Sequence, residues 1–144
     1  MTLYIRETAG GQDQWSDYEQ LGFAVSCMLH HRNYSLHPIK SVQERLIFAI
    51  QHGQIKFLFD TNDQPLAYVL WACLTEDTET QLQRDPEFLL HPSEWNEGDR
   101  IWLLDFCCRP GFAPQAIKRF NKLKPWGEGQ VRWQNRKRKV MTLA

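Results

Sequence analysis

An apolar run with one carboxylate inside it constrains this chain more than any other feature. The run reads Ile101-Trp102-Leu103-Leu104-Asp105-Phe106-Cys107-Cys108. Its β-branched, aromatic and aliphatic residues predict a buried strand. A carboxylate in such a strand is costly to bury unless it is paired or hydrogen-bonded. We therefore expect Asp105 to have a partner elsewhere in the chain, and a histidine is the first candidate.

Apolar residues at helical spacing predict helices on both sides of this strand. Asp13 or Ser16 can cap the first helix, which should end before Pro38. Ser41 and Glu44 form a capping-box pattern at the start of the second helix. The predicted helices cover about 13–31, 41–52, 76–90 and 114–123, the third of them a polar connector.

Alternating and continuous apolar segments predict the strands. Two such segments flank the turn cluster Asp60-Thr61-Asn62-Asp63 and should form a hairpin. The order of helices and strands predicts an α/β (α+β) fold, a sheet with helices packed on it. The predicted strands cover 55–59, 65–74, 101–108 and, as the last one, 131–133, while residues 1–12 form an edge strand or a loose arm.

Length and composition predict a single domain over residues 1–144. The 17 basic and 17 acidic residues give a formal net charge of +0, so overall charge favours neither nucleic acid nor membrane as a partner. The 4 cysteines include no C-x-x-C pair, which favours a reducing compartment. No signal-peptide pattern or membrane span is expected, because no apolar run approaches about 18 residues. We expect a cytoplasmic protein.

Charge is unevenly distributed along the chain. Nine of the 17 basic residues lie between Lys118 and Lys139, whereas the segment from Glu76 to Asp99 is acidic. A basic C-terminal face could receive an acidic partner. The four cations at 136–139 are expected to form a solvated or frayed end, and no known nucleic-acid-binding pattern accompanies them.

Two kinds of partner can justify the buried carboxylate of Asp105. His30 and His31, at the end of the first predicted helix, would make a His–Asp pair in which the carboxylate orients the imidazole and the imidazole removes a proton. A structural arginine, Arg100 or Arg109, would satisfy the carboxylate without any chemistry. Spacing alone leaves these alternatives open.

Other groupings point to chemistry less strongly. Cys27, His30, Cys107 and Cys108 are zinc-binding residue types without metal-type spacing, so we predict core cysteines and no metal site. No G-x-S-x-G elbow is present, which argues against a hydrolase triad. The loop 109–113 suits anion binding at a helix N-terminus, but its single glycine is equally typical of a simple turn. Cofactor-binding residues stay unassigned.

Several segments resemble the toxin-activating lysine acyltransferases, which acylate internal lysines of RTX protoxins. His31-Arg32-Asn33-Tyr34 resembles H-R-[ND]-W in that family. Residues 65–72, PLAYVLWA, resemble P-V-A-Y-C-S-W-A, and residues 98–106, GDRIWLLDF, resemble S-G-D-R-x-W-[FI]-I-D-W. Pro110-Gly111 fits the turn that follows. The similarity covers about residues 20 to 135.

The resemblance implies a GNAT-like acyltransferase fold with a mostly antiparallel central sheet. It implies a fatty acyl group on acyl carrier protein as the donor, no bound cofactor, and a lysine of an RTX protoxin as the acceptor. The catalytic histidine of the family falls on His31 and its catalytic aspartate on Asp105. The basic face would then dock acyl carrier protein. Tyr68, Trp71, Trp102 and Phe106 would line a groove for the acyl chain or form ordinary core.

Departures from the family pattern keep some alternatives open. Met28 stands three residues before His31, where the family usually has Ser, and alignment on His30 would place Cys27 there instead. The loop 109–113 is one residue short of the coenzyme A loop of GNAT enzymes, which favours a protein-bound donor. The alternative functions are a non-catalytic module that binds carrier protein or toxin and a coenzyme A-dependent N-acetyltransferase. The oligomeric state is open, with a homodimer among the alternatives.

Overall fold

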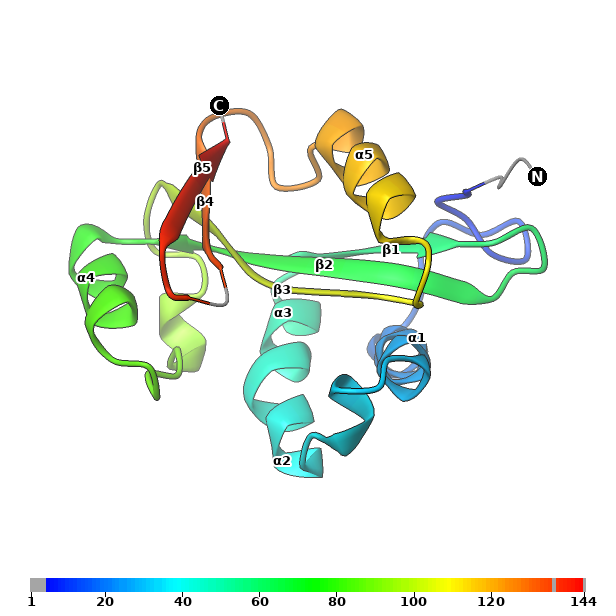
Figure 1. Cartoon of the computed structure of the whole chain (residues 1–144), viewed down its shortest axis with the longest axis horizontal. Helices are drawn as coiled ribbons and strands as arrows, with labels where there is room; N and C mark the ends of the chain where they lie inside the picture. The colour runs from blue at the N-terminus through cyan, green and yellow to red at the C-terminus, as the bar shows by residue number, and fades with distance from the viewer. Residues whose placement is uncertain (1–4, 136, 144) are drawn as a thin grey trace.

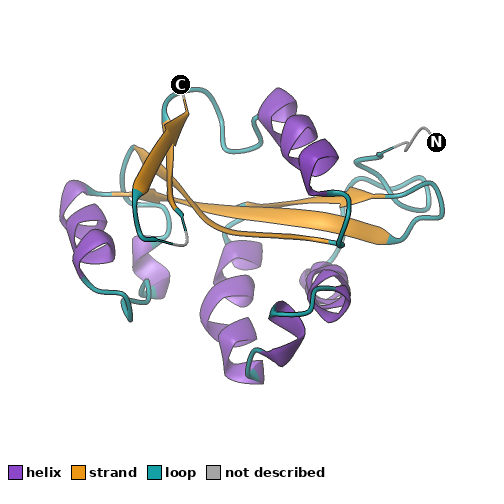
Figure 2. Cartoon of the chain, in the orientation of Figure 1, coloured by secondary structure: helices purple, strands orange, loops and turns teal. Residues whose placement is uncertain are grey.

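Helices cover both faces of a five-stranded sheet in the computed structural model, which describes residues 5–135 and 137–143 (Figures 1 and 2). The helices α1, α2 and α3 lie against one face, α5 lies against the other, and α4 lies beyond the end of β2 (Figure 1). In chain order the elements are α1 (Asp17–His30), η1 (Tyr34–Leu36), α2 (Ile39–Ser41), η2 (Val42–Ile47), α3 (Phe48–Gln51), β1 (Ile55–Phe59), β2 (Pro65–Leu74), α4 (Glu76–Arg84), η3 (Pro92–Glu94), β3 (Arg100–Cys108), α5 (Ala113–Leu123), β4 (Val131–Gln134) and β5 (Val140–Leu143).

The strands follow the order β1-β2-β3-β4-β5 across the sheet. Neighbouring strands are antiparallel except β3 and β4, which are parallel and are joined through α5. The α/β (α+β) class with a mostly antiparallel sheet is therefore confirmed. The parallel pairing is short, since only Ile101↔Val131 and Trp102↔Arg132 are in register. Beyond these pairs β3 and β4 part.

A bulge in β3 changes which way its side chains point. Leu70 of β2 pairs with Asp105, but Trp71 pairs with Leu103, so Leu104 is an extra residue. An extra residue breaks the alternation of side chains across a strand. Asp105 therefore faces the same side as Leu104 and Leu70, the side covered by α1 and α3.

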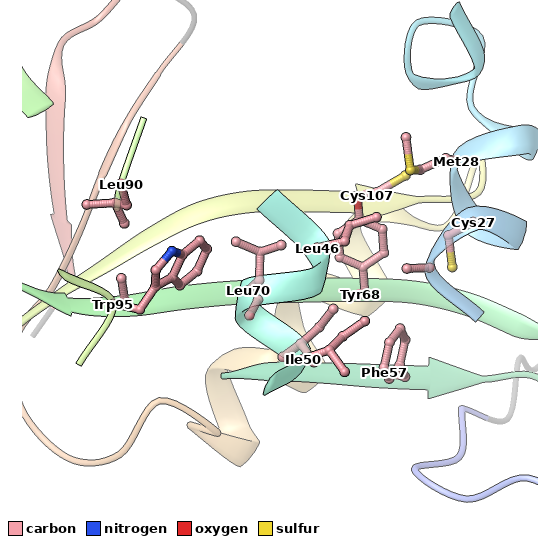
Figure 3. Packing of buried hydrophobic residues seen from close by; sticks show 14 of the residues in the cluster. Cys27, Met28, Leu46, Ile50, Phe57, Tyr68, Leu70, Leu90, Trp95 and Cys107 are labelled. Atoms are coloured by element: carbon pink, nitrogen blue, oxygen red, sulfur yellow. The ribbon is translucent and has the colours of Figure 1, made fainter. Parts of the chain in front are cut away.

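The core has two parts, one on each face of the sheet. On the α1 and α3 side, Cys27 and Met28 of α1 pack with Tyr68 and Cys107 of the sheet (Figure 3). On the α5 side, Phe120 packs against the buried residues of β2 and β3 that face α5. The strands β2 and β3 are thus covered on both faces, which explains their nearly continuous apolar sequence.

Local chemistry sets the helix boundaries. Ser16 caps α1, with Glu19 N donating to Ser16 Oγ at 3.1 Å and Ser16 N donating to Glu19 Oε1 at 3.0 Å. The second helical segment begins at Ile39 after Pro38, so the capping box expected at Ser41 does not form. It continues through the π-helical η2 into α3. The connector helix expected over 76–90 stops at Arg84, because Asp85 precedes a proline and leaves the helical region.

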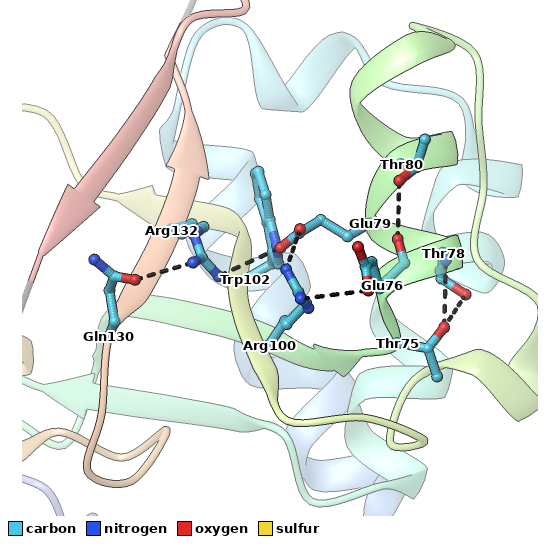
Figure 4. A network of polar contacts seen from close by, with 9 residues as sticks. All are labelled: Thr75, Glu76, Thr78, Glu79, Thr80, Arg100, Trp102, Gln130 and Arg132. Atoms are coloured by element: carbon cyan, nitrogen blue, oxygen red, sulfur yellow. Dashed lines mark hydrogen bonds and ion pairs between the residues drawn. The ribbon is translucent and has the colours of Figure 1, made fainter.

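Glu79 of α4 joins this helix to the sheet (Figure 4). Its carboxylate accepts hydrogen bonds from Trp102 Nε1 at 2.7 Å, Arg100 Nη1 at 2.8 Å and Arg132 Nη1 at 3.3 Å. The buried charge is thus paired with cations from both β3 and β4, at the point where those strands are in register.

The C-terminal segment differs from expectation, whereas the N-terminal segment pairs at the sheet edge, as one of its two expected alternatives has it. Residues 140–143 form β5, a strand that the sequence did not predict, and the basic segment is part of a hairpin turn rather than a frayed end. Asn135 Oδ1 accepts from the backbone of Lys137 and Lys139 in this turn, while Arg136 lies outside the described residues. Near the N-terminus, Arg6 makes a two-bond bridge to Phe59, and residues 1–4 lie outside the described residues. Among the described residues, no helix is both long enough and apolar enough to cross a membrane.

Candidate active site

Two tyrosines hold the carboxylate of Asp105. The hydroxyl of Tyr34, in η1, donates to Oδ1, and the hydroxyl of Tyr68, in β2, donates to Oδ2 at 3.0 Å. The Tyr34 hydroxyl also lies 3.0 Å from the carbonyl oxygen of Phe106. Each carboxylate oxygen therefore accepts one phenol hydrogen bond, so the buried charge is satisfied without a cation in direct contact.

The arginine partners considered from the sequence are engaged elsewhere. Arg100 pairs with Glu76 and Glu79, and Arg109 pairs with Asp60 at 3.1 Å. A structural arginine bridge is therefore the wrong account of Asp105. The pair between Arg109 and Asp60 also ties the loop after β3 to the β1–β2 turn, which agrees with a simple turn at 109–113.

Burial and hydrogen bonding act on Asp105 in opposite directions. Burial raises the pKa of the Asp105 carboxyl, while the phenols of Tyr34 and Tyr68 and the charge of Arg45 act to lower it. Burial, followed by the nearby charge of Asp105, raises the pKa of both phenols well above the ordinary value. The two hydroxyls therefore stay protonated at neutral pH and remain hydrogen-bond donors.

His31 lies next to this group but is joined to it through Tyr34. His31 is the C-cap residue of α1, and its Nδ1 accepts from the backbone N–H of Asn33 at 3.3 Å and of Tyr34 at 3.5 Å. Its ring packs perpendicular to that of Tyr34 with centroids 4.8 Å apart. In the described part of the chain no hydrogen bond links His31 to Asp105. With Nδ1 accepting, the neutral imidazole carries its proton on Nε2.

The neighbouring His30 is oriented differently. Its Nδ1 lies 2.8 Å from the carbonyl oxygen of Ser26 in the preceding turn of α1. This bond holds the ring against its own helix, and His30 is exposed. Of the two histidines, His31 is the one that contacts Tyr34, which donates a hydrogen bond to Asp105.

A cavity of about 480 Å³ opens where β3 and β4 part. Tyr34 and Asp105 are on its wall, so the carboxylate group and one of its phenols face the space. Most of the lining is apolar and comes from β3 on one side of the gap, from β4 and β5 on the other, and from α5. It includes Leu103 and Phe106 of β3, Phe120 of α5, Trp126, Trp133 of β4 and Leu143 of β5.

Only one of the four expected groove residues lines this cavity. Phe106 does, whereas Tyr68 and Trp102 are buried in the core on the α1 side and Trp71 in the core on the α5 side. The other residues that line it come mainly from β3, α5 and β4, with one from β5. Sequence reasoning missed them because β5 was not predicted and because the gap depends on where the β3–β4 pairing ends.

The tyrosines were also missed as partners of Asp105. The available signal was a tyrosine within an apolar segment, because a buried phenol usually needs a hydrogen-bond partner. Tyr68 is such a residue, with no exposed surface. Tyr34 carries the same signal more weakly, since its surroundings in the sequence are polar.

The cysteines are placed as core residues. Cys27 and Cys107 pack on one face of the sheet and Cys108 on the other. Burial raises the pKa of Cys27 to about 12 and that of Cys108 to about 11, so these thiols are poor nucleophiles at neutral pH. Within residues 5–135 and 137–143, no three His, Cys, Asp or Glu side chains are grouped to hold a metal ion.

Comparison with known proteins finds one family. A sequence model of the RTX toxin acyltransferase family matches residues 13–142. The leukotoxin-activating lysine-acyltransferase LktC of a Pasteurella haemolytica-like species is 34% identical over 93 residues, which are 65% of this chain and 53% of the relative. The RTX-II toxin-activating lysine-acyltransferase ApxIIC of Actinobacillus pleuropneumoniae is 32% identical over 101 residues, 70% of this chain and 60% of the relative.

A third relative and one solved structure extend the comparison. The protein-lysine palmitoyltransferase CyaC of Bordetella bronchiseptica is 36% identical over 76 residues, 53% of this chain and 38% of the relative. The chain thus spans between 38% and 60% of the length of these three relatives. A crystal structure of histone acetyltransferase HPA2 and related acetyltransferase from Corynebacterium glutamicum matches with a TM-score of 0.43 and 9% identity, over 93% of this chain and 77% of that one. A score of this size does not establish a common fold.

Proposed function

Because the chain belongs to the RTX toxin acyltransferase family, we propose that it is a protein-lysine acyltransferase. In this proposal it transfers a fatty acyl group from acyl carrier protein to internal lysines of an RTX protoxin and thereby activates the toxin. The observation that carries the proposal is the position of Asp105. Its carboxylate lies on the wall of an apolar cavity and accepts hydrogen bonds from two phenols. His31 packs against one of these phenols, that of Tyr34.

The chemistry requires a base. A lysine side chain is protonated at neutral pH and cannot attack a thioester until it loses a proton. We assign that role to His31, with Asp105 stabilising the imidazolium that forms. In the free chain both groups contact Tyr34 and not each other. Catalytic hydrogen bonds are often long in free enzymes and tighten when substrate binds.

Acyl transfer removes two protons from the lysine nitrogen. The lysine ammonium gives one proton to Nδ1 of His31, the ring nitrogen that carries none, and the backbone N–H groups that donate to Nδ1 are released. The free amine then attacks the thioester carbonyl, so that a C–N bond forms. The tetrahedral intermediate then collapses, the C–S bond breaks and the carrier thiolate leaves. The second proton lost by the nitrogen ends on that sulfur, and the first is released to water. The products are the amide, the free thiol of the carrier and one proton.

The cavity suits the acyl chain of the donor. Its apolar lining would remove a hydrocarbon chain from water, and its wall would place the thioester beside Asp105. On α5, Lys118 and Lys122 are exposed and could contact an acidic carrier protein. Together with the degenerate loop at 109–113, this supports a donor bound to carrier protein over free coenzyme A.

Mass spectrometry tests the proposal directly. The chain incubated with acylated carrier protein and protoxin should add one fatty acyl mass to specific lysines. Asp105→Asn and His31→Ala should each slow that transfer by about 10²–10⁴-fold, the usual contribution of a positioned base. Full activity of both variants would refute the assigned mechanism.

Two other results would favour a different function. Binding of carrier protein or protoxin without any mass change would indicate a non-catalytic binding module. Tight calorimetric binding of acetyl-coenzyme A, followed by acetylation of a small amine, would indicate a coenzyme A-dependent acetyltransferase.

A further inference from the structure

Tyr34 contacts both proposed catalytic residues, each with a different part of its structure. Its hydroxyl donates to Asp105, its ring packs perpendicular to the His31 ring at 4.8 Å, and its backbone N–H donates to His31 Nδ1 at 3.5 Å. It also lines the cavity next to Asp105. No other residue in the described part of the chain has hydrogen bonds to both His31 and Asp105.

The backbone holds Tyr34 at a fixed place relative to His31. The segment η1 begins three residues after the histidine, and Ser35 N donates to His31 O at 2.9 Å. His37 N then donates to Tyr34 O at 3.1 Å, which closes the turn. The distance between the imidazole and the phenol is therefore set by local hydrogen bonds, whereas the distance to Asp105 depends on the tertiary fold.

Tyr68 provides a natural comparison within the same site. Like Tyr34, it donates a phenol hydrogen bond to the Asp105 carboxylate, at 3.0 Å. Unlike Tyr34, it is completely buried, does not line the cavity and has no hydrogen bond or ring contact with His31. Both tyrosines thus donate a hydrogen bond to the carboxylate, but Tyr34 also contacts His31.

We propose that Tyr34 is the positioning residue that joins His31 to Asp105 and sets their relative orientation for acyl transfer. This inference rests on the proposed function. The Tyr34 hydroxyl keeps one carboxylate oxygen turned toward η1, so the negative charge of Asp105 faces the imidazole across the phenol. When His31 takes the lysine proton, that charge stabilises the imidazolium. Arg45 of η2 and Cys107 of β3 also face Asp105 and are held constant in the test below.

The kinetic test compares Tyr34→Phe with Tyr68→Phe. Each variant removes one phenol hydrogen bond from the same carboxylate and keeps the aromatic ring. We expect Tyr34→Phe to lower kcat by about 100-fold with little change in KM for the acylated carrier, the effect of a misplaced catalytic group. Tyr68→Phe should lower kcat by a clearly smaller factor. Tyr34→Trp, whose indole N–H can still donate, should recover part of the activity.

A spectroscopic test measures the influence of Asp105 on His31 and requires no acyl transfer. NMR titration would give the pKa of His31 in the chain as it stands, in Asp105→Asn, in Tyr34→Phe and in the double variant, with circular dichroism as the check of folding. We expect Asp105→Asn to lower the pKa of His31, and to do so by at most half as much when Tyr34 is already Phe. In a Tyr68→Phe background the full effect should persist.

The outcomes separate this inference from the function. If the two Tyr→Phe variants lose activity equally and the His31 titration responds to Asp105 equally in both backgrounds, Tyr34 is only one of two structural donors and the inference fails. If the unaltered chain transfers no acyl group, the proposed function fails, and the NMR titration still decides whether Tyr34 connects His31 to Asp105.

Discussion

Individual residues show that this chain buries carboxylates in two ways. Glu79 is surrounded by two guanidiniums and an indole N–H, whereas the side chains that donate hydrogen bonds to Asp105 are two neutral phenols. A buried charge paired with cations is satisfied structurally. A buried charge held by neutral donors keeps an unbalanced negative charge, which is what a proton-transfer site requires. The different partners fit a structural role for Glu79 and the proposed catalytic role for Asp105.

Asp105→Asn should increase stability at neutral pH while it slows acyl transfer. Burial raises the pKa of Asp105 above its ordinary value of 3.8, so the folded state binds a proton more tightly than the unfolded state. The stability of the unaltered chain is then highest below that ordinary value and falls as pH rises through the raised pKa. We expect a gain of about 1 kcal/mol for the variant at pH 7, typical of relieving a functional site.

Urea unfolding from pH 3 to pH 8 measures this gain. The difference between the variant and the unaltered chain should be smallest at the acid end and grow with pH. At each pH, the quantity compared is the free energy of unfolding of the variant minus that of the unaltered chain. A smaller difference at pH 7 than at pH 3 would contradict the direction of the pKa shift.

Among the elements, local sequence predicted most helices and strands and the pairing of β1 with β2, but not the pairing of the later strands. The hairpin of β1 and β2 and the strand β3 follow from apolar runs and a turn cluster, which are local signals. β5 was missed because four cations precede a stretch of only four residues. The bulge at Leu104 was missed because it exists only in the pairing with β2. A carboxylate that needed a partner was predictable from the sequence, whereas the two phenols that satisfy it depend on tertiary packing.

Gly98 marks a close approach between the start of β3 and the end of β2. A Cβ at this position would lie 2.0 Å from the carbonyl oxygen of Leu74 and 2.4 Å from the backbone nitrogen of Thr75. Both are backbone atoms that cannot move aside without breaking the β2–β3 register. We expect Gly98→Ala to lower the free energy of unfolding by about 3 kcal/mol, the upper range for overpacking.

Gly22 is the matched control for this substitution. It lies exposed inside α1, and no atom is within 4 Å of a Cβ built on it. Gly22→Ala should raise the free energy of unfolding by about 0.5–1 kcal/mol through helix propensity. Equal effects of the two substitutions in thermal or urea unfolding would show that the close approach at Gly98 is not rigid.

At the scale of the whole molecule, the sheet separates α5 from α1, α2 and α3 (Figure 1). The helix α5 carries exposed Lys118 and Lys122 beside the cavity, while α1, α2 and α3 cover the opposite face (Figure 1). A donor that docks by charge would therefore approach from the α5 side. In the proposed function, this arrangement would bring an acidic carrier to the side of the sheet on which α5 lines the apolar cavity.

Reversal of charge on α5 should weaken this docking. In the double variant Lys118→Glu and Lys122→Glu, we expect KM for the acylated carrier to rise roughly 10-fold with kcat preserved, because like charges then meet. Lys40→Glu, a change at another exposed lysine, on α2, is the control. KM of the unaltered chain should also rise with salt. No difference between the α5 and α2 variants would place the carrier elsewhere.

The strand order β1-β2-β3-β4-β5 has a consequence for synthesis on the ribosome. Each strand pairs with the strand made just before it, so the sheet can grow from one edge as the chain emerges. Tyr34 and Tyr68 both precede Asp105, so both phenols have left the ribosome when the β3 carboxylate emerges. The carboxylate and its two phenols thus emerge before α5, β4 and β5, which supply much of the cavity lining.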